Sequence, residues 1–147
     1  MTITAGFQVG SGILLSADTM YTGEMKSYAT KIKTTAVDGG KVAFALSGSE
    51  DCCLMLIQAC EKALFRSSYD KPSMEQLEDV IASTLGRLFQ DHNLQDDDAQ
   101  FLIAAWTVKD GLRLLSTRRG IVVERDRYYC NGSGGVSCDL SHRTGFS

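Results

Sequence analysis

The sequence predicts an α+β fold, in which antiparallel strands precede and follow a pair of helices. Three observations predict it. Residues 3–9 alternate between apolar and polar side chains, which is typical of a half-buried strand. Apolar residues then recur at helical spacing in two stretches, from Asp51 to about Phe65 and from Ser73 to about Asp91. Finally, Asp110-Gly111 separates two apolar stretches, as in a β-hairpin. The predicted order is four strands, two helices and then further strands, with the helices packed on one face of a sheet.

Four strands are predicted before the helices. Gly10-Ser11-Gly12 provides the turn of an N-terminal hairpin, and Asp38-Gly39-Gly40 provides a second turn. The polar segment 22–30 is expected to be a loop. The strands are expected at residues 3–9, 12–18, 31–37 and 41–47.

Two helices and further strands follow. The first helix is predicted from Asp51 to about Phe65, where apolar residues form one stripe. The second begins after Ser73, because Ser73 and Gln76 have the spacing of a capping box. Gln95–Asp98 is expected to be a solvated loop, and Asn131–Gly135 another loop. The later strands are expected at residues 100–108, 112–116, 120–123 and 126–130.

Composition excludes several classes of protein. The 147 residues carry a formal net charge of −3 with no basic block, so nucleic acid is not an expected partner. No apolar run reaches the length of a membrane helix, and residues 1–10 do not resemble a secretory signal. We therefore expect a cytoplasmic protein that does not enter a membrane. Neither metal ligands nor a cofactor motif can be recognised in the sequence.

The five cysteines are expected to be reduced and mostly structural. Their number is odd, they form no Cys-x-x-Cys pair, and Cys53 and Cys60 lie in an apolar helical stretch. The two histidines are far from the cysteines in the sequence, which argues against a zinc site.

The N-terminus offers a possible nucleophile. Removal of Met1 would leave Thr2 as the first residue. An N-terminal threonine combines a nucleophilic hydroxyl with an α-amine that titrates near about 8 and can accept a proton. Asp18, at the end of a predicted strand, and Lys31 could form an ion pair that lowers the proton affinity of Thr2. Gly48 lies where a strand meets a helix, and a backbone N–H there could hold an oxyanion.

Taken together, these residues resemble the proteasome-like N-terminal-nucleophile (Ntn) hydrolase family, of the 20S α/β-subunit type. The resemblance rests on Thr2–Gly6, Gly12–Thr19 with Thr22-Gly23, Lys31-Ile32, Leu46–Asp51 and Asn131–Gly135, in the order of the family. It implies an αββα sandwich of antiparallel sheets between helical layers. It also implies amide-bond hydrolysis through an ester on Thr2, with a peptide or an unfolded protein as substrate and a homo-oligomeric ring as the assembly.

The resemblance assigns each residue a role. Thr2 would be nucleophile and base, Asp18 and Lys31 the supporting ion pair, and Gly48 the oxyanion donor. Ser133 would help to position the α-amine or its water. The segment between Thr22 and Lys31 is shorter than usual in the family, so Lys33 competes with Lys31 for the role of the lysine.

The C-terminal sequence departs from the family. Residues 1–135 are expected to form a partial domain that lacks the last third of the fold, and residues 136–147 to form an aperiodic, disordered tail. A truncated chain is expected to be weakly active or inactive. Two alternatives remain: a non-catalytic, ring-forming structural subunit, in which Thr2 is only the second residue, and a small α+β binding domain of other ancestry.

Overall fold

A computed structural model describes residues 3–9, 12–17, 20–21, 27–28, 32–67, 70–125 and 128–132. The strands are β1 (Ile3–Val9), β2 (Gly12–Ala17), β3 (Met20–Tyr21), β4 (Ser27–Tyr28), β5 (Ile32–Val37), β6 (Gly40–Gly48), β7 (Ala99–Thr107), β8 (Gly111–Arg118), β9 (Ile121–Arg125) and β10 (Tyr128–Gly132); the helices are α1 (Glu50–Arg66) and α2 (Met74–Asp91).

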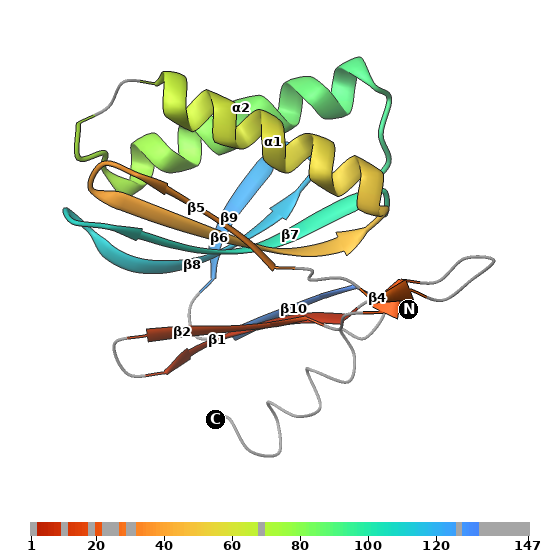
Figure 1. Cartoon of the computed structure of the whole chain (residues 1–147), viewed down its shortest axis with the longest axis horizontal. Coiled ribbons are helices and arrows are strands. Elements are labelled where there is room, and N and C mark those ends of the chain that lie inside the picture. The colour runs from red at the N-terminus through yellow and green to blue at the C-terminus, as the bar shows by residue number, and fades with distance from the viewer. Residues whose placement is uncertain are drawn as a thin grey trace.

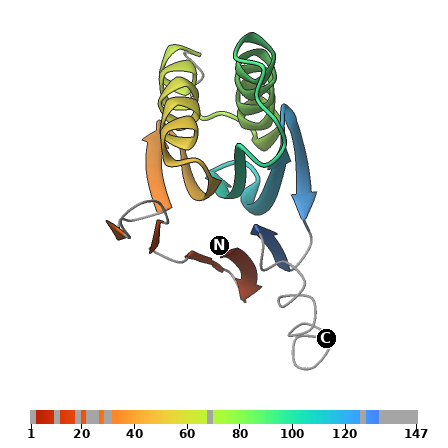
Figure 2. The same ribbon diagram turned by 90° about the vertical axis from the view of Figure 1, so that its right-hand side faces the viewer.

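These elements form three layers (Figures 1 and 2). The middle layer is an antiparallel five-stranded sheet of order β5-β6-β7-β8-β9. Helices α1 and α2 cover one face of this sheet, and the three-stranded sheet β10-β1-β2 lies against its other face. The α+β class and the packing of both helices on one sheet face are therefore confirmed. A second helical layer is not found among the described residues, so the full αββα sandwich is not confirmed.

Helix α2 begins where the sequence predicts. The Ser73 hydroxyl accepts a hydrogen bond from the Gln76 N–H (3.2 Å), and the Ser73 N–H donates to Gln76 Oε1 (2.9 Å). This reciprocal pair is a capping box. Asp110, in the turn between β7 and β8, adds a further acceptor, because its Oδ2 lies 2.7 Å from the Met74 nitrogen. The β7–β8 turn therefore fixes the position of the first turn of α2.

The hydrophobic core lies between the helices and the five-stranded sheet. Alternate residues of the central strands point toward the helices, and Phe44 and Phe101 meet edge to face with ring centroids 5.9 Å apart. Burying each such side chain contributes about 1.5–3 kcal/mol. The core includes Val42, Phe44, Leu46, Leu56, Cys60, Leu77, Ile81, Leu85, Phe101, Ile103, Ala105 and Leu115.

Two glycines allow close packing between layers. Gly6 of β1 is buried, and a Cβ at this position would lie 2.8 Å from Leu114 Cδ1 of β8. Gly120, in the turn between β8 and β9, lies against Gly86 of α2, and a Cβ on Gly120 would collide with the Gly86 backbone. Because neither position leaves room for a Cβ at its present spacing, the two sheets meet closely at Gly6 and α2 meets the sheet closely at Gly120.

The structure departs from the sequence prediction at two places. Residues 20–21 and 27–28 form a short antiparallel ladder, with Met20 opposite Tyr28, whereas part of this segment was expected to be a loop. Asn131 and Gly132 belong to β10 rather than to a loop, because they pair with Thr4 and Ile3 of β1. Pairing with a distant strand here overrides the turn preference of Asn-Gly.

No helix in the described part of the chain is long and apolar enough to cross a membrane.

Candidate functional site

Of the five residues predicted to form a catalytic site, the structure describes Gly48. Thr2, Asp18, Lys31 and Ser133 lie outside the described residues, and so do the boundary predicted at residue 135 and the segment 136–147. Lys33, the alternative to Lys31, is half-buried in β5 opposite Phe44. Because Phe44 points into the core, strand alternation places Lys33 on the helix-facing side of the sheet.

Gly48 forms a tight corner between β6 and α1. Its φ is +119°, and a Cβ there would collide with the carbonyl oxygen of Asp98 and lie 2.8 Å from the carbonyl carbon. The next residue, Ser49, donates its N–H to the same Asp98 oxygen at 2.8 Å and occupies the N-cap position of α1. Only glycine fits this backbone conformation and this approach without strain.

This corner lies at the N-terminal end of α1, whose first turn also carries the carboxylates of Glu50 and Asp51. Gly48 is exposed, and it immediately precedes the first turn of α1. Backbone N–H groups at the start of a helix carry partial positive charge and can stabilise a developing oxyanion. The prediction that Gly48 lies where a strand meets a helix is confirmed, whereas its role as a donor stays a prediction.

The ends of three neighbouring strands lie at one end of the smaller sheet. Strand β1 is central, with Ile3 opposite Gly132 of β10 and Thr4 opposite Ala17 of β2. Figure 1 shows the start of β1 on the same side of the molecule as the arrowhead of β6, where Gly48 ends the strand. The start of β1 and the Gly48 corner therefore lie at the same end of the two packed sheets.

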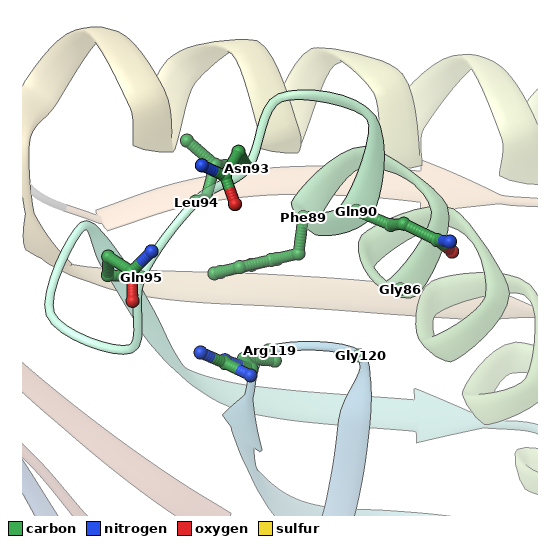
Figure 3. Close-up of a pocket in the computed structure, with 8 residues that line it drawn as sticks. All are labelled: Gly86, Phe89, Gln90, Asn93, Leu94, Gln95, Arg119 and Gly120. Atoms are coloured by element: carbon green, nitrogen blue, oxygen red, sulfur yellow. The ribbon is translucent and has the colours of Figure 1, made fainter.

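A pocket of about 340 Å³ lies between the C-terminal part of α2 and the turn between β8 and β9 (Figure 3). Phe89 forms an apolar wall, and Arg119 lies across the pocket from it. Both Asn93 and Arg119 have left-handed backbones, with φ of 51° and 56°. The pocket is lined by Gly86, Phe89, Gln90, Asn93, Leu94, Gln95, Arg119 and Gly120.

Asp96 holds two arginines beside this pocket. Its Oδ2 lies 2.9 Å from Arg118 Nη2 and 3.0 Å from Arg118 Nε, and its Oδ1 lies 2.6 Å from Arg119 Nε. The hydrogen bond from Arg118, aided by the charge of Arg119, lowers the pKa of the Asp96 carboxyl below its usual value. The carboxylate therefore stays ionised and fixes the β8–β9 turn to the loop after α2.

One short loop connects this pocket with the Gly48 corner. The Gln95 N–H donates to Asp98 Oδ2 at 2.6 Å, and the Asp98 N–H donates to the Gln95 oxygen at 3.1 Å. The carbonyl of Asp98 then contacts Gly48 and Ser49. The sequence predicts a solvated loop at residues 95–98, and no local pattern in it links Asp96 to arginines 22 and 23 residues later.

Helix α1 carries three cysteines that form no disulfide and pack in or beside the core. Cys53 and Cys60 are buried, and Cys52 is half-buried. Burial, with a smaller contribution from the charge of Glu61, raises the pKa of the Cys60 thiol to about 12. A thiol with so high a pKa is a poor nucleophile at neutral pH. Within the described ranges, no group of three or more metal-ligating side chains comes together.

The fold is similar to that of solved Anbu structures. An Anbu mutant from Hyphomicrobium sp. strain MC1 matches with a TM-score of 0.77 and 13% identity, covering 99% of this chain and 65% of that one. Anbu (ancestral β-subunit) from Yersinia bercovieri matches with a TM-score of 0.78 and 15% identity, covering 97% and 65%. The helical assembly of the Anbu complex from Pseudomonas aeruginosa gives 0.77 and 13%, covering 96% and 65%.

These matches support a proteasome-like fold and correct the assignment made from sequence. No protein-family model matches the sequence, and no curated protein matches it. The assignment to the 20S α/β-subunit type is wrong, because the solved structures described above are Anbu proteins, which are proteasome-like but form a distinct family. The chain spans about 65% of the length of these neighbours.

Proposed function

We propose that this chain is a subunit of a proteasome-like assembly in the cytoplasm that hydrolyses peptide bonds through Thr2. The observation that carries the proposal is the convergence of strand ends. Thr2 precedes Ile3, Asp18 follows Ala17, and Ser133 follows Gly132 in the sequence. Ile3 pairs with Gly132, and the next residue of β1 pairs with Ala17, so the chain reaches these three residues from adjacent strand ends.

The other two residues of the proposed site belong to the larger sheet. Lys31 precedes Ile32, the first residue of β5, and Gly48 is the last residue of β6. Ile32 pairs with Ala45, three residues before Gly48, so β5 begins where β6 approaches its end. The proposed site thus draws on five strand ends of two packed sheets. The αββα sandwich is proposed as the complete architecture, of which the described residues supply one helical layer and both sheets.

The proposed chemistry requires Met1 to be removed. The Thr2 hydroxyl attacks the carbonyl carbon of the peptide bond, and the α-amine of Thr2 accepts the hydroxyl proton. The Gly48 N–H stabilises the resulting oxyanion, and Asp18 and Lys31 lower the proton affinity of the nucleophile. Collapse of this intermediate transfers the proton to the leaving amine and leaves an ester on Thr2. Water then hydrolyses the ester, and Ser133 helps to position the α-amine or this water.

Hydrolysis of fluorogenic peptides tests this proposal. Thr2→Ala is expected to abolish turnover, whereas Thr4→Ala, two residues along β1, serves as the matched control and is expected to retain it. Lys31→Ala should lower kcat far more than Lys33→Ala, because Lys33 is held within β5 opposite Phe44, whereas Lys31 precedes the first residue of that strand. Equal hydrolysis by the Thr2→Ala variant and the unchanged chain would remove Thr2 from the mechanism.

The second candidate is a non-catalytic structural subunit that self-assembles. It is favoured by the solved neighbour described as a helical assembly of the Anbu complex. Intact-mass measurement separates the candidates, because a retained Met1 blocks the α-amine that the chemistry needs. Self-association of this chain is part of both candidates.

A further inference from the structure

The five-stranded sheet has two outer edges, β5 and β9. In the part of the chain that the structure describes, β5 pairs with β6 alone and β9 with β8 alone. Four antiparallel steps separate the two edges, so β5 and β9 run in the same direction. A second copy that is shifted sideways in the plane of the sheet, without rotation, would therefore place its β9 next to β5 of the first copy.

The β5 edge carries a groove and an exposed aromatic side chain. The groove has a volume of about 530 Å³ and lies between the end of β5 and the last turns of α1. Phe65 on its rim is 87% exposed, which is unusual for so large an apolar side chain in a folded domain. Its lining residues are Thr35, Ala36, Val37, Glu61, Lys62, Phe65 and Arg66. Two cations and one carboxylate make the groove basic.

The β9 edge is acidic. Glu78 of α2 lies near Glu75 and Asp79 of the same helix and near Glu124 of β9. Burial, followed by repulsion from these three carboxylates, raises the pKa of the Glu78 carboxyl, and Arg113 opposes the shift. Arg113 itself pairs with Glu124 at 3.3 Å. We name this group the acidic edge: Glu75, Glu78, Asp79 and Glu124.

Apolar side chains extend the same edge. Ile121 and Val123 are 64% and 39% exposed, and they lie on the face of β9 that is turned away from the helices. The β9 edge therefore offers apolar surface as well as negative charge.

The basic groove and the acidic edge lie on the helix-facing side of the five-stranded sheet, at similar positions along the direction of its strands. The sheet register places one residue from every strand in a common row, Lys33, Phe44, Ile103, Leu115 and Glu124. Glu124 is thus level with Lys33, which is two residues from Thr35 in the groove. Opposite charges occupy the two opposite edges of one sheet, near the same end of the strands.

We propose that the β5–α1 groove of one copy binds the β9–α2 acidic edge of the next copy. Lys62 and Phe65 of the first copy face the acidic edge of the second. Because the two surfaces differ, the contact is heterologous, and its repetition generates a ring when it closes and a helix when it does not. The proposal rests on the self-association proposed above, but it does not depend on the chemistry of Thr2.

Charge reversal tests this interface by sedimentation over a range of concentrations. Lys62→Glu and Glu78→Lys are each expected to weaken self-association by at least about tenfold, because like charges then face each other. The double variant restores association, since both charges are exchanged. Asp91→Lys is the matched control, since Asp91 is exposed at the other end of α2, and it is expected to assemble like the unchanged chain. Circular dichroism confirms that each variant is folded.

A mixture of the two single variants provides a sharper test. The intact groove of Glu78→Lys can bind the intact acidic edge of Lys62→Glu, and the remaining two surfaces carry exchanged charges that attract as in the double variant, so the mixture is expected to assemble as alternating copies. An isologous contact would instead stop at pairs. Assembly that neither single reversal weakens overturns the interface and leaves self-association intact. A chain that stays monomeric at every concentration overturns self-association itself.

Discussion

Gly48 shows how one residue defines the geometry of the candidate site. Its positive φ and its contact with Asp98 explain why a glycine follows the buried end of β6. The sequence contains this signal, because a glycine between an apolar strand and a helical stretch predicts a corner. The contact with Asp98 was not predictable, since it depends on how β7 aligns with β6.

Substituting Gly48 tests this geometry. We expect Gly48→Ala to lower the free energy of unfolding by about 1–3 kcal/mol, because its Cβ collides with the Asp98 carbonyl and its φ disfavours a side chain. Gly111→Ala is the matched control: its φ is +76°, yet a Cβ there meets nothing within 4 Å. Urea denaturation of both variants measures the difference. An equal loss would show that the backbone angle alone matters.

The environment of Cys60 predicts a slow reaction with alkylating agents. Its thiol is 0% exposed and has a pKa of about 12, so thiolate is scarce at pH 8. We expect iodoacetamide to modify half-buried Cys52 well before Cys60 in the folded chain, as mass spectrometry of peptides would show. Urea is the control, because unfolding exposes both thiols. Equal rates without urea would contradict the burial of Cys60.

At the scale of elements, local signals predicted the hairpins and helices better than the short strands. The capping box at Ser73 and the hairpin at Asp110-Gly111 depend on neighbouring residues, and the structure confirms both. The two-residue strands β3 and β4 are too short for alternation to be recognised. The last residues of β10 resemble a turn and become a strand because they pair with β1. Pairing with a distant strand thus determined the structure of these residues, which sequence periodicity could not predict.

The contact between Gly86 and Gly120 gives a prediction with an internal control. A Cβ on Gly120 would collide with the Gly86 backbone, so Gly120→Ala is expected to cost about 1–3 kcal/mol of stability. A Cβ on Gly86 meets Gly120 at an ordinary 3.6 Å, and alanine favours a helix by about 1 kcal/mol. Thermal unfolding should therefore show a lower Tm for Gly120→Ala and an unchanged or higher Tm for Gly86→Ala. The reverse order would contradict the packing of α2 on the turn.

At the scale of the whole molecule, charge is unevenly distributed. The net charge of −3 gave no hint of a partner, but the fold gathers four carboxylates from α2 and β9 at one edge. Residues 75, 78 and 79 are close in the sequence, whereas Glu124 joins them only through the fold. The composition predicts neither this acidic edge nor the basic groove opposite it.

The raised pKa of Glu78 predicts a dependence of stability on pH. Above pH 4.5, the pKa of this carboxyl in the unfolded chain, the unfolded chain releases the proton before the folded chain does. Glu78 therefore lowers the free energy of unfolding increasingly until the pH passes its folded pKa, and the loss then stays constant. We expect Glu78→Gln to be more stable than the unchanged chain at pH 7 and to gain nothing from this source at pH 3.5. Urea titrations at both pH values, at concentrations where the chain is monomeric, measure the difference. An equal gain at both pH values would exclude this cause.

The central position of β1 has a consequence for the synthesis of the chain. The first strand to leave the ribosome pairs on one side with its immediate successor, but its other partner is β10, which begins at Tyr128. Closing so long a loop is slow, and it cannot begin before the late strand is made. A nucleophile at the N-terminus would therefore gain its full surroundings only after nearly all of the described chain has been translated. Such timing would protect the nascent chain from its own chemistry.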